Sequence, residues 1–488
     1  MSEYILTIWL EIHLKIKSAN KMFCQCKNEQ NFEQLKPNTN ICPVCTGQPG
    51  ALPTLSYEVL EKSLILGKTL NCNINMNSSF DRKSYFYPDL PMWYQITQLY
   101  HPTCTEGQVS FFVDSNYDNE RTIHIQDAHM ENDTAKMIHS WWDALIDFNR
   151  AGTPLVEIVT KPDFWSADEV VEFLKELQRI VRYNWISDAD MEKWQMRADV
   201  NISIRKNESD SLGTRVEMKN MSSFMAIKRA IENEFNRQKR LYENWENFSQ
   251  QTRWRDDAKW ESYLMRSKEE ALDYRYFPEP DLPVLNLEKI EDSEWEKILE
   301  KIEKTDLSIP YLLIKKFKQE FWFHKEYINA LISDKEVLDY FLDCVSDKLD
   351  PKVVVKWIAG PIAAYMKWNL VWINDLKIDI NQFGNFIKIA SEWKILDNQM
   401  KIVMDEMLVN GWNAEDIVKA KWFDSPAVND DEIENIVKSV IDENPSIVEQ
   451  YKWGKTTTLG FFVWQVMKKT WWKINPKIAW EMVEKLLN

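Results

Sequence analysis

The sequence predicts an α+β protein in which a strand-rich first half is followed by a helical second half. Residues 1–290 hold several segments that alternate strictly between apolar and polar residues, whereas helical spacing dominates from about 290 to 488. A proline-rich passage, residues 276–283, lies near the change and is expected to close the first domain. At about 150 residues per domain, a chain of 488 residues is long enough for roughly three domains.

The expected strands come from three alternating segments, residues 10–17, 197–205 and 215–219. Alternation with period two is typical of strands that bury one face, and such strands usually pair in antiparallel fashion. The expected helices include residues 334–342 and 431–441, where apolar residues recur three or four positions apart. The first domain is therefore expected to present one polar sheet face.

Composition and charge exclude several classes of protein. Hydrophobic residues make up 44% and charged residues 28%, which is an ordinary globular balance rather than a disordered one. We find no run of 18 uncharged apolar residues and no secretion signal, so we expect a cytoplasmic protein without a membrane partner. The net charge is −16, so an RNA partner would have to meet a local basic face.

Glycine is scarce and tryptophan is abundant, at 11 and 23 residues. Average glycine use is about 7%; here 11/488 is about 2%, whereas (11+23)/488 returns to about 7%. Trp185, Trp245 and Trp260 lie in polar, turn-like contexts where glycine is expected. One interpretation is that many of these positions are glycine, encoded by UGA in a lineage that reads this codon as glycine; the other is a genuinely tryptophan-rich protein. The codons of the gene decide between them.

Four of the seven cysteines form two close pairs, Cys24 with Cys26 and Cys42 with Cys45. Two thiolate pairs joined by a loop can fold into one tetrahedral site of the kind that zinc prefers. Four protein ligands leave no position for a reacting water, so the expected zinc is structural. Four reduced cysteines without a metal are the alternative.

Acidic and amide side chains mark the polar face of the expected sheet. Carboxylates gathered on one surface repel each other unless cations neutralise them, and Mg²⁺ takes oxygen ligands of this kind. Mg²⁺ in turn neutralises and orients the phosphates of a nucleotide. For any single residue a solvated strand face is the simpler interpretation, but the set spans five segments: Glu11 and His13; His129, Glu131 and Asp133; Glu157; Asp199 and Asn201; and Glu217.

Residues 80–91 place the adjacent pair Arg82 and Lys83 among aromatic residues that include Tyr85. Such a segment can hold phosphate, or a tRNA 3′ end against stacking rings. The alternative is an aromatic loop packed on the core, with two surface charges. The sequence has no GxxxxGK[ST] loop and no GxGxxG fingerprint, so any ATP site must be built on the sheet.

Taken together, long segments of the chain resemble the tRNA-handling B subunit of the aspartyl/glutamyl-tRNA(Asn/Gln) amidotransferases, the GatB family. The resemblance covers essentially the whole chain, and its motifs run in fixed order. The matching stretches are residues 10–13, 42–53, 80–91, 94–96, 147–159, 197–201, 217–220, 265–270, 273–282, 465–468 and 475–476. In the family pattern, glycine stands at Trp9, Trp93, Trp142, Trp185, Trp194, Trp245, Trp260, Trp393, Trp412, Trp422, Trp464 and Trp472, whereas Trp357 matches a true tryptophan.

The resemblance implies a protein that uses ATP to phosphorylate the side-chain carboxylate of Glu-tRNA(Gln) or Asp-tRNA(Asn). Ammonia from a partner amidase subunit then replaces the phosphate, and a small third subunit completes a heterotrimer. It also implies a glutamine-synthetase-like catalytic domain at 1–290, a helical domain at 291–410 and a small tRNA-binding tail domain at 411–488. The reaction class is a glutamine-hydrolysing carbon–nitrogen ligase (EC 6.3.5.-).

The resemblance also implies ATP and Mg²⁺ as cofactors, in addition to the expected structural zinc. The expected Mg²⁺ ligands are Glu11, His13, Glu131, Glu157 and Asp199, which are also the expected catalytic residues with Lys83. The expected contacts to substrate or phosphate are Arg82, Lys83, Tyr85 and Asn201.

One departure from the family pattern bears on this expectation. The family usually has Glu-Glu-Asp where this chain has Glu131-Asn132-Asp133. If the second Glu of that pattern binds metal, Asn132 keeps an amide oxygen but loses a charge, and metal affinity would fall. Two alternatives therefore stay open. One is a catalytically weakened tRNA-binding scaffold of the same complex, and the other is a glutamine-synthetase-like ligase acting on a free amino acid.

Overall fold

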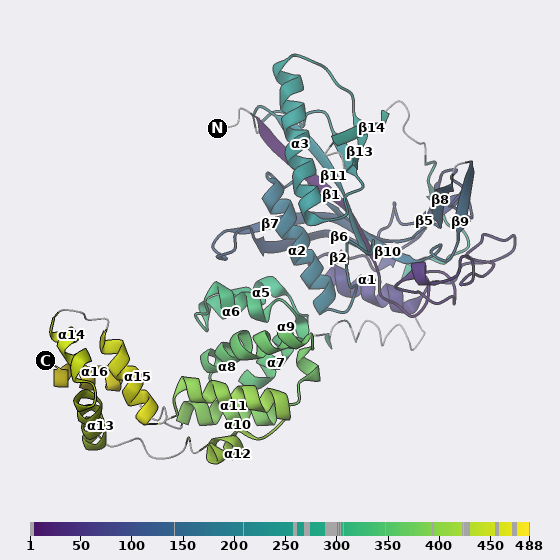
Figure 1. Ribbon diagram of the computed structural model, residues 1–488. Helices are drawn as coiled ribbons and strands as arrows, with labels where there is room; N and C mark the ends of the chain where they lie inside the picture. The colour runs from purple at the N-terminus through teal and green to yellow at the C-terminus, as the bar shows by residue number, and fades with distance from the viewer. Residues whose placement is uncertain are drawn as a thin grey trace. The chain divides into compact units, whose positions relative to one another are not determined.

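The computed structural model forms two compact units, Met1–Gln319 and Glu320–Asn488 (Figure 1). It describes residues 4–140, 142–207, 209–256, 261–267, 274–287, 300, 302, 304–305, 307–346, 348–392, 395–421, 423, 430–453, 458–470 and 476–487. The expected boundary near residue 290 and the positions Trp260, Trp393, Trp422 and Trp472 lie outside the described residues. The division into three domains stays a prediction.

The first unit is built on a nine-stranded sheet. Its strands are, in spatial order, β14 (Glu261–Ser267), β13 (Gln251–Asp256), β12 (Val216–Lys219), β11 (Met196–Arg205), β1 (Ile5–Lys15), β10 (Pro154–Thr160), β7 (Glu120–Asn132), β6 (Cys104–Phe112) and β2 (Asn73–Ile74). The alternating segments predicted as strands form β1, β11 and β12, which confirms them. The sheet is mixed rather than antiparallel throughout, because β12 and β13 pair in parallel. Helix α3 (Phe224–Glu243) connects these two strands, and a crossover of this kind permits parallel pairing.

Three small sheets complete the first unit. Strand β4 (Asp81–Ser84) lies between β15 (Phe277–Pro278) and β5 (Tyr94–Thr97). Strand β16 (Leu285–Asn286) pairs with β3 (Asn77–Ser78), and β8 (Lys136–Ser140) forms a hairpin with β9 (Asp143–Asp147). The remaining elements of the first unit include η1 (Phe32–Gln34) and α5 (Pro310–Gln319).

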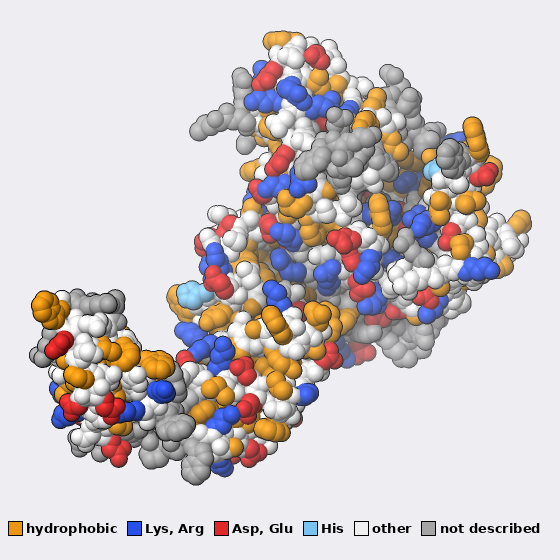
Figure 2. Space-filling view, viewed as in Figure 1, with side chains coloured by type: hydrophobic (Ala, Val, Ile, Leu, Met, Phe, Trp, Pro, Cys, Tyr) orange, Lys and Arg blue, Asp and Glu red, His pale blue; other side chains and the backbone are white. Residues whose placement is uncertain are grey.

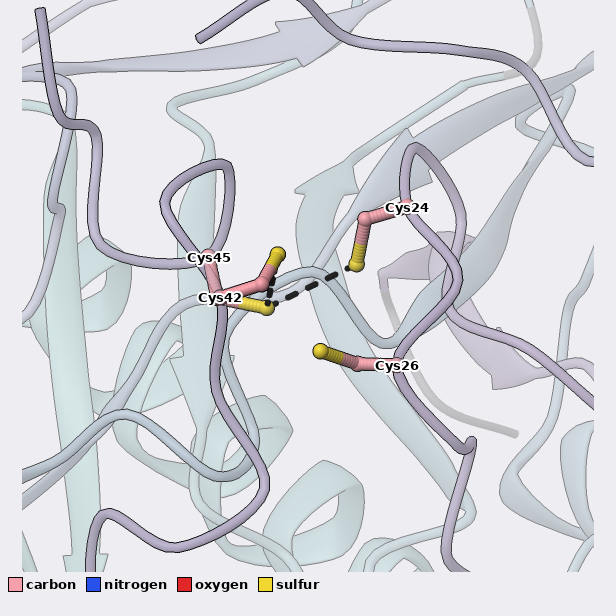
Figure 3. Close-up of side chains that lie close together, drawn as sticks. All are labelled: Cys24, Cys26, Cys42 and Cys45. Carbon is pink, nitrogen blue, oxygen red and sulfur yellow. Dashed lines mark hydrogen bonds between the residues drawn. The ribbon is translucent and has the colours of Figure 1, made fainter.

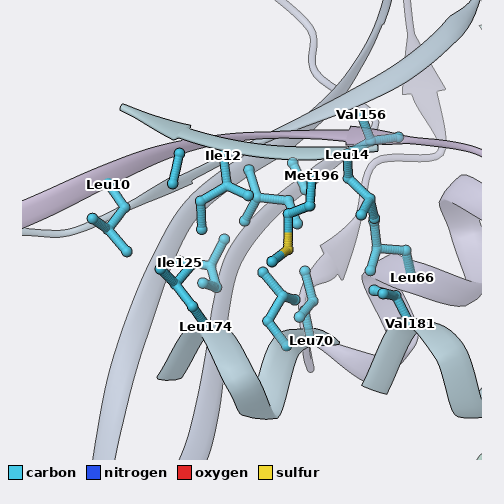
Figure 4. Close-up of a cluster of buried hydrophobic side chains, with 14 of the residues drawn as sticks. Leu10, Ile12, Leu14, Leu66, Leu70, Ile125, Val156, Leu174, Val181 and Met196 are labelled. Carbon is cyan, nitrogen blue, oxygen red and sulfur yellow. The ribbon is translucent and has the colours of Figure 1, made fainter. Parts of the chain in front are cut away.

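Helices cover the apolar face of the large sheet. Leu10, Ile12 and Leu14 of β1 point to this face and are fully buried. They pack against α1 (Tyr57–Thr69) and α2 (Ala167–Tyr183), whose Leu66 and Leu174 lie in the same cluster (Figure 4). The intervening residues of β1, among them Glu11 and His13, must therefore face the opposite side, because successive strand residues alternate between faces.

The second unit is helical, as its spacing predicted. Its elements are α6 (Lys325–Leu331), α7 (Lys335–Ser346), α8 (Pro351–Trp357), η3 (Ile358–Ile362), α9 (Ala363–Asn369), η4 (Ile373–Asp375), α10 (Ile380–Glu392), α11 (Asp397–Asn410), α12 (Ala414–Ala420), α13 (Asp430–Asp442), α14 (Pro445–Lys452), α15 (Leu459–Lys469) and α16 (Pro476–Leu487). The last helices share a small core of their own that includes Val437, Phe462 and Val483. On the face shown in Figure 2, basic and acidic side chains are interspersed. Among the described helices, none has the length and apolarity that crossing a membrane requires.

Two tryptophans occupy helix-terminal positions that favour glycine. Trp185 follows α2 with φ 55°, and Trp245 follows α3 with φ 59°. After α2, the Ile186 N–H donates to the Val181 carbonyl at 2.9 Å, and the Trp185 N–H donates to the Arg182 carbonyl at 3.1 Å. This pair of bonds is the Schellman motif, whose left-handed residue is usually glycine.

The end of α3 repeats this geometry, with the Glu246 N–H donating to the Leu241 carbonyl at 2.9 Å. Three further tryptophans have a left-handed backbone: Trp93 (φ 64°), Trp194 (φ 57°) and Trp322 (φ 58°). All five of these side chains are exposed, so packing does not explain them. Trp357, by contrast, is buried in α8 against Phe386. The backbone thus favours the glycine interpretation at these five positions, of which Trp322 was not among those expected.

Candidate active site

A row of ionisable side chains crosses four adjacent strands on the polar face of the large sheet. In the strand register, His129 of β7 lies opposite Glu157 of β10, Glu157 lies opposite His13 of β1, and His13 lies opposite Arg197 of β11. Directly opposed residues of antiparallel strands share a face, and their Cβ atoms are about 4.5–5.5 Å apart. Four strands far apart in sequence therefore bring their charges together.

The first possible metal group consists of His13, Glu131 and Glu157, whose ligand atoms lie within 4.8 Å of one another. His13 Nδ1 is 3.0 Å from Glu131 Oε1. Burial alone would raise the pKa of Glu157, but His13, His129 and Lys83 hold it below its ordinary value. Burial alone would lower the pKa of His13, and the carboxylates of Glu157 and Glu131 raise it instead. The group thus holds opposite charges close together in a largely buried setting.

The second possible metal group consists of Glu11, Asp199 and Glu217, again within 4.8 Å of one another. Lys219 lies between two of these carboxylates: its Nζ is 2.9 Å from Glu217 Oε1 and also forms an ion pair with Asp199. Burial, followed by the charges of Glu157 and Glu217, raises the pKa of Glu11. Asn201 Nδ2 donates to Glu11 Oε1 at 3.2 Å.

The five residues predicted to bind metal fall into two neighbouring groups. Glu11 lies near carboxylates of β11 and β12, whereas His13, two positions along β1, lies near carboxylates of β7 and β10. Glu217 completes the second group, although the sequence prediction did not count it among the ligands. Its signal was the alternation of residues 215–219, which places Glu217 on a polar strand face.

The adjacent residues Arg82 and Lys83 of β4 point to opposite faces of their strand. Burial would lower the pKa of Lys83, but Glu131 and Glu157 of the first group are among the charges that raise it. Its Nζ lies 5.0 Å from the ring centroid of Tyr274, which also packs edge-on against Tyr85. Burial raises the pKa of Tyr85. Lys83 is therefore placed to meet an anion at the first metal group.

Arg82, also expected to contact phosphate, has close partners within the protein. Its Nε and one terminal nitrogen each lie 2.7 Å from a carboxylate oxygen of Glu279. A further bond of 3.0 Å reaches Asp281, and the guanidinium lies 4.2 Å from the ring centroid of Tyr94. These contacts join β4 to the segment around β15, and the phosphate contact of Arg82 stays a prediction.

Asn132 does not belong to either metal group. Its Oδ1 accepts a hydrogen bond from the Ile96 N–H at 2.9 Å, and the side chain is buried. Because Asn132 follows Glu131 in the extended strand β7, it points to the other face. The amide at position 132 therefore removes no ligand from the two groups. Asn132 thus no longer favours the alternative of a catalytically weakened scaffold.

Two protein-family models match long parts of this chain. A family model described as the GatB/GatE catalytic domain matches residues 6–291, and another, described as the GatB domain, matches residues 339–487. The chain belongs to the GatB family. This GatB chain is 38% identical to the B subunit of the aspartyl/glutamyl-tRNA(Asn/Gln) amidotransferase from Crocosphaera subtropica, over 100% of this chain and 98% of that protein.

Two further relatives carry the same name. The protein of Clostridium botulinum (strain Eklund 17B / Type B) is 39% identical over 99% of this GatB chain and 100% of its own length. The protein of Thermosipho melanesiensis is 40% identical over 98% of each chain. The GatB resemblance inferred from the motifs is thereby confirmed.

The donor sets of this GatB chain fit the expected metals by their chemistry. Each carboxylate group offers mainly oxygen ligands, which suits Mg²⁺. The four cysteines lie in two facing loops with their sulfurs turned toward one another (Figure 3). Cys45 Sγ is 3.5 Å from Cys24 Sγ and 3.7 Å from Cys42 Sγ, and all four sulfurs lie within 4.8 Å.

Within the cysteine group, the thiolate form is favoured at Cys45, whereas the hydrogen bond to Cys45 and burial raise the pKa of Cys24. A hydrogen bond from Cys24 and the charge of Lys21 lower the pKa of Cys45 to about 4, despite burial. Lys21 is fully buried, and its Nζ lies 3.4 Å from Cys45 Sγ. A thiolate is the form that binds zinc, so an all-sulfur site at this position fits a structural Zn²⁺.

Proposed function

We propose that this chain is the member of a glutamine-hydrolysing amidotransferase complex that activates the side-chain carboxylate of Glu-tRNA(Gln), Asp-tRNA(Asn) or both. The observation that carries the proposal is the convergence of His13, Glu131, Glu157 and Lys83 on the polar face of the sheet. The family membership and the name that the relatives share support it. We further propose a cytoplasmic heterotrimer of this chain, an amidase partner and a small third protein.

The proposed activation is a phosphoryl transfer from ATP. A carboxylate oxygen of the aminoacyl group attacks the γ-phosphorus, the bond from that phosphorus to the β,γ-bridging oxygen breaks, and ADP leaves with the electron pair. The product is an acyl phosphate. Ammonia, supplied by glutamine hydrolysis on the amidase partner, attacks the acyl carbon, expels phosphate and loses a proton. Activation is needed because a free carboxylate resists nucleophilic attack.

Each part of the site has a proposed task in this reaction. The two groups of possible metal ligands would hold Mg²⁺, which neutralises and orients the phosphates when bound. One group is Glu11, Asp199 and Glu217, and the other is His13, Glu131 and Glu157. Lys83 meets the negative charge of the transferred group, and Asn201 orients Glu11 through its hydrogen bond. Tyr85 packs beside Tyr274 near Lys83, where it can contact substrate. The cysteine group holds a structural Zn²⁺.

The finer description of the fold is also a proposal. We propose that residues 1–290 form a glutamine-synthetase-like catalytic domain, which suits a sheet with carboxylates on one face. Residues 291–410 then form the helical domain, and residues 411–488 form a tail domain that binds tRNA. The separate apolar core of the last helices supports a distinct tail.

The test is ADP release by the purified complex of this chain with its partners. The proposal expects ADP and amidated tRNA to form together, and only with misacylated tRNA, ATP and Mg²⁺ present. Turnover with free glutamate alone would indicate a ligase on the free amino acid. A complex that binds misacylated tRNA but releases no ADP would indicate a scaffold, and either result contradicts the proposal.

A further inference from the structure

Arg197 lies where the two candidate metal groups meet. It is directly opposite His13 of the first group, in the register of β1 and β11. Along β11, it is two residues from Asp199 of the second group, which is about 6.5 Å on the same strand face. An anion that contacts cations in both groups would therefore lie within reach of its guanidinium.

The guanidinium of Arg197 forms one ion pair and keeps most of its hydrogen-bond donors available. One terminal nitrogen lies 3.6 Å from Asp133 Oδ1, an ion pair longer than a hydrogen bond, and the side chain is 31% exposed. Within the described part of the chain, Arg197 makes no side-chain hydrogen bond. A guanidinium carries five N–H donors, so most donors of Arg197 remain available for a ligand.

Arg150, the other arginine on Asp133, shows a different arrangement. Its Nε lies 3.6 Å from the second oxygen of Asp133. The same Nε donates to the Thr134 carbonyl at 3.0 Å, and one terminal nitrogen donates to the Ala135 carbonyl at 2.7 Å and to Thr134 Oγ1 at 3.3 Å. Arg150 is thus fixed by hydrogen bonds, whereas Arg197 is held by its longer ion pair with Asp133 and keeps its donors for a ligand.

We propose that Arg197 is a catalytic residue that binds the phosphoryl group as it passes from ATP to the substrate carboxylate. This inference rests on the proposed function and adds a residue to it. In that transfer, negative charge lies on the three equatorial oxygens of the moving group. A planar guanidinium matches two such oxygens in a bidentate contact, which a lysine ammonium cannot make. Asp133 holds the guanidinium in place without occupying its donors.

The experiment compares two nucleotides on the heterotrimeric complex. Arg197→Met and Arg197→Lys are measured for binding of ADP and of a non-hydrolysable ATP analogue with an imido-linked γ-phosphate, and for ADP release. Arg205→Lys is the matched control, because Arg205 ends the same strand and hydrogen-bonds the Asp210 carbonyl. Thermal unfolding of each variant reports on the fold.

We expect Arg197→Met to lower the affinity for the ATP analogue roughly 10-fold or more while the affinity for ADP stays unchanged. The same variant should slow ADP release by about 100-fold or more. Arg197→Lys should show the same pattern to a smaller degree, and it tests the inference if the methionine variant does not fold. An equal loss of affinity for both nucleotides, or no loss of affinity for either, overturns the inference. A wild-type complex that releases no ADP contradicts the proposed function itself, so the two failures are distinguishable.

Discussion

Nε2 of His129 lies 3.3 Å from a carboxylate oxygen of Glu157. The other ring nitrogen, Nδ1, lies 2.7 Å from Asp127 Oδ1. Because both nitrogens face carboxylates, the ring donates to both only as the imidazolium. Burial would lower the pKa of His129, but Asp127 and Glu157 raise it to about 10. The chain Asp127–His129–Glu157 therefore orients a proposed metal ligand.

The first prediction is that His129→Asn weakens metal binding without unfolding the complex. Partners that orient a metal ligand typically contribute 10- to 100-fold in affinity, and we expect a loss of about that size. The measurement is a titration with Mn²⁺, followed by electron paramagnetic resonance. His124→Asn is the control, since His124 lies on the same strand and pairs with Asp163 at 2.7 Å outside the site. Equal Mn²⁺ affinity in wild type and His129→Asn would remove His129 from this role.

The second prediction concerns Asp199→Asn. We expect amidation to fall by more than about 100-fold, because a direct ligand should matter at least as much as the residues that orient one. The fold should persist, because Lys219 keeps its ion pair with Glu217. Glutamine hydrolysis by the amidase partner is the internal control, and Asp210→Asn in the surface turn after β11 is the matched variant. Normal amidation by Asp199→Asn would exclude Asp199 from the site.

Local sequence pattern accounts for much of the fold. Strands β1, β11 and β12 were predictable because alternation is visible within a few residues. The parallel pairing of β12 with β13 was not, because it depends on where α3 returns the chain. The same limit applies to Arg82, whose partner Glu279 is 197 residues away in the chain. Contacts of that range follow from the tertiary fold and leave no local signal.

In the candidate site, too, residue types follow from the local sequence, whereas their grouping follows from the tertiary fold. Residue type and alternation in the sequence marked Glu11, His13 and Asp199 as candidate metal ligands, which stay a prediction. The sequence did not separate them into two groups, because the register between strands decides which residues meet. Asn132, however, could have been interpreted from the sequence, since a residue adjacent to Glu131 in an extended strand must face the other way. The family motif drew attention to position 132, and the strand period was the better guide.

The third prediction is that the cysteine group holds one zinc ion per chain. Cys42→Ser removes one of four ligands, so we expect the bound zinc to fall to near zero and the unfolding temperature to drop by several degrees. Metal content is measured by inductively coupled plasma mass spectrometry on the purified complex. Cys72→Ser is the control, because Cys72 lies outside the group. Purified wild type without stoichiometric zinc would contradict the prediction.

The fourth prediction is that Trp185→Gly and Trp245→Gly each stabilise the protein that carries tryptophan at both positions. A residue with a Cβ in the left-handed region costs roughly 1–2 kcal/mol, and both side chains are exposed, so little packing is lost. We expect the free energy of unfolding in urea to rise by about that amount for each change. Trp357→Gly is the control and should lower it by about 3–5 kcal/mol, because Trp357 is buried within α8. Destabilisation by the first two changes, or UGG codons at these positions, would refute the glycine interpretation.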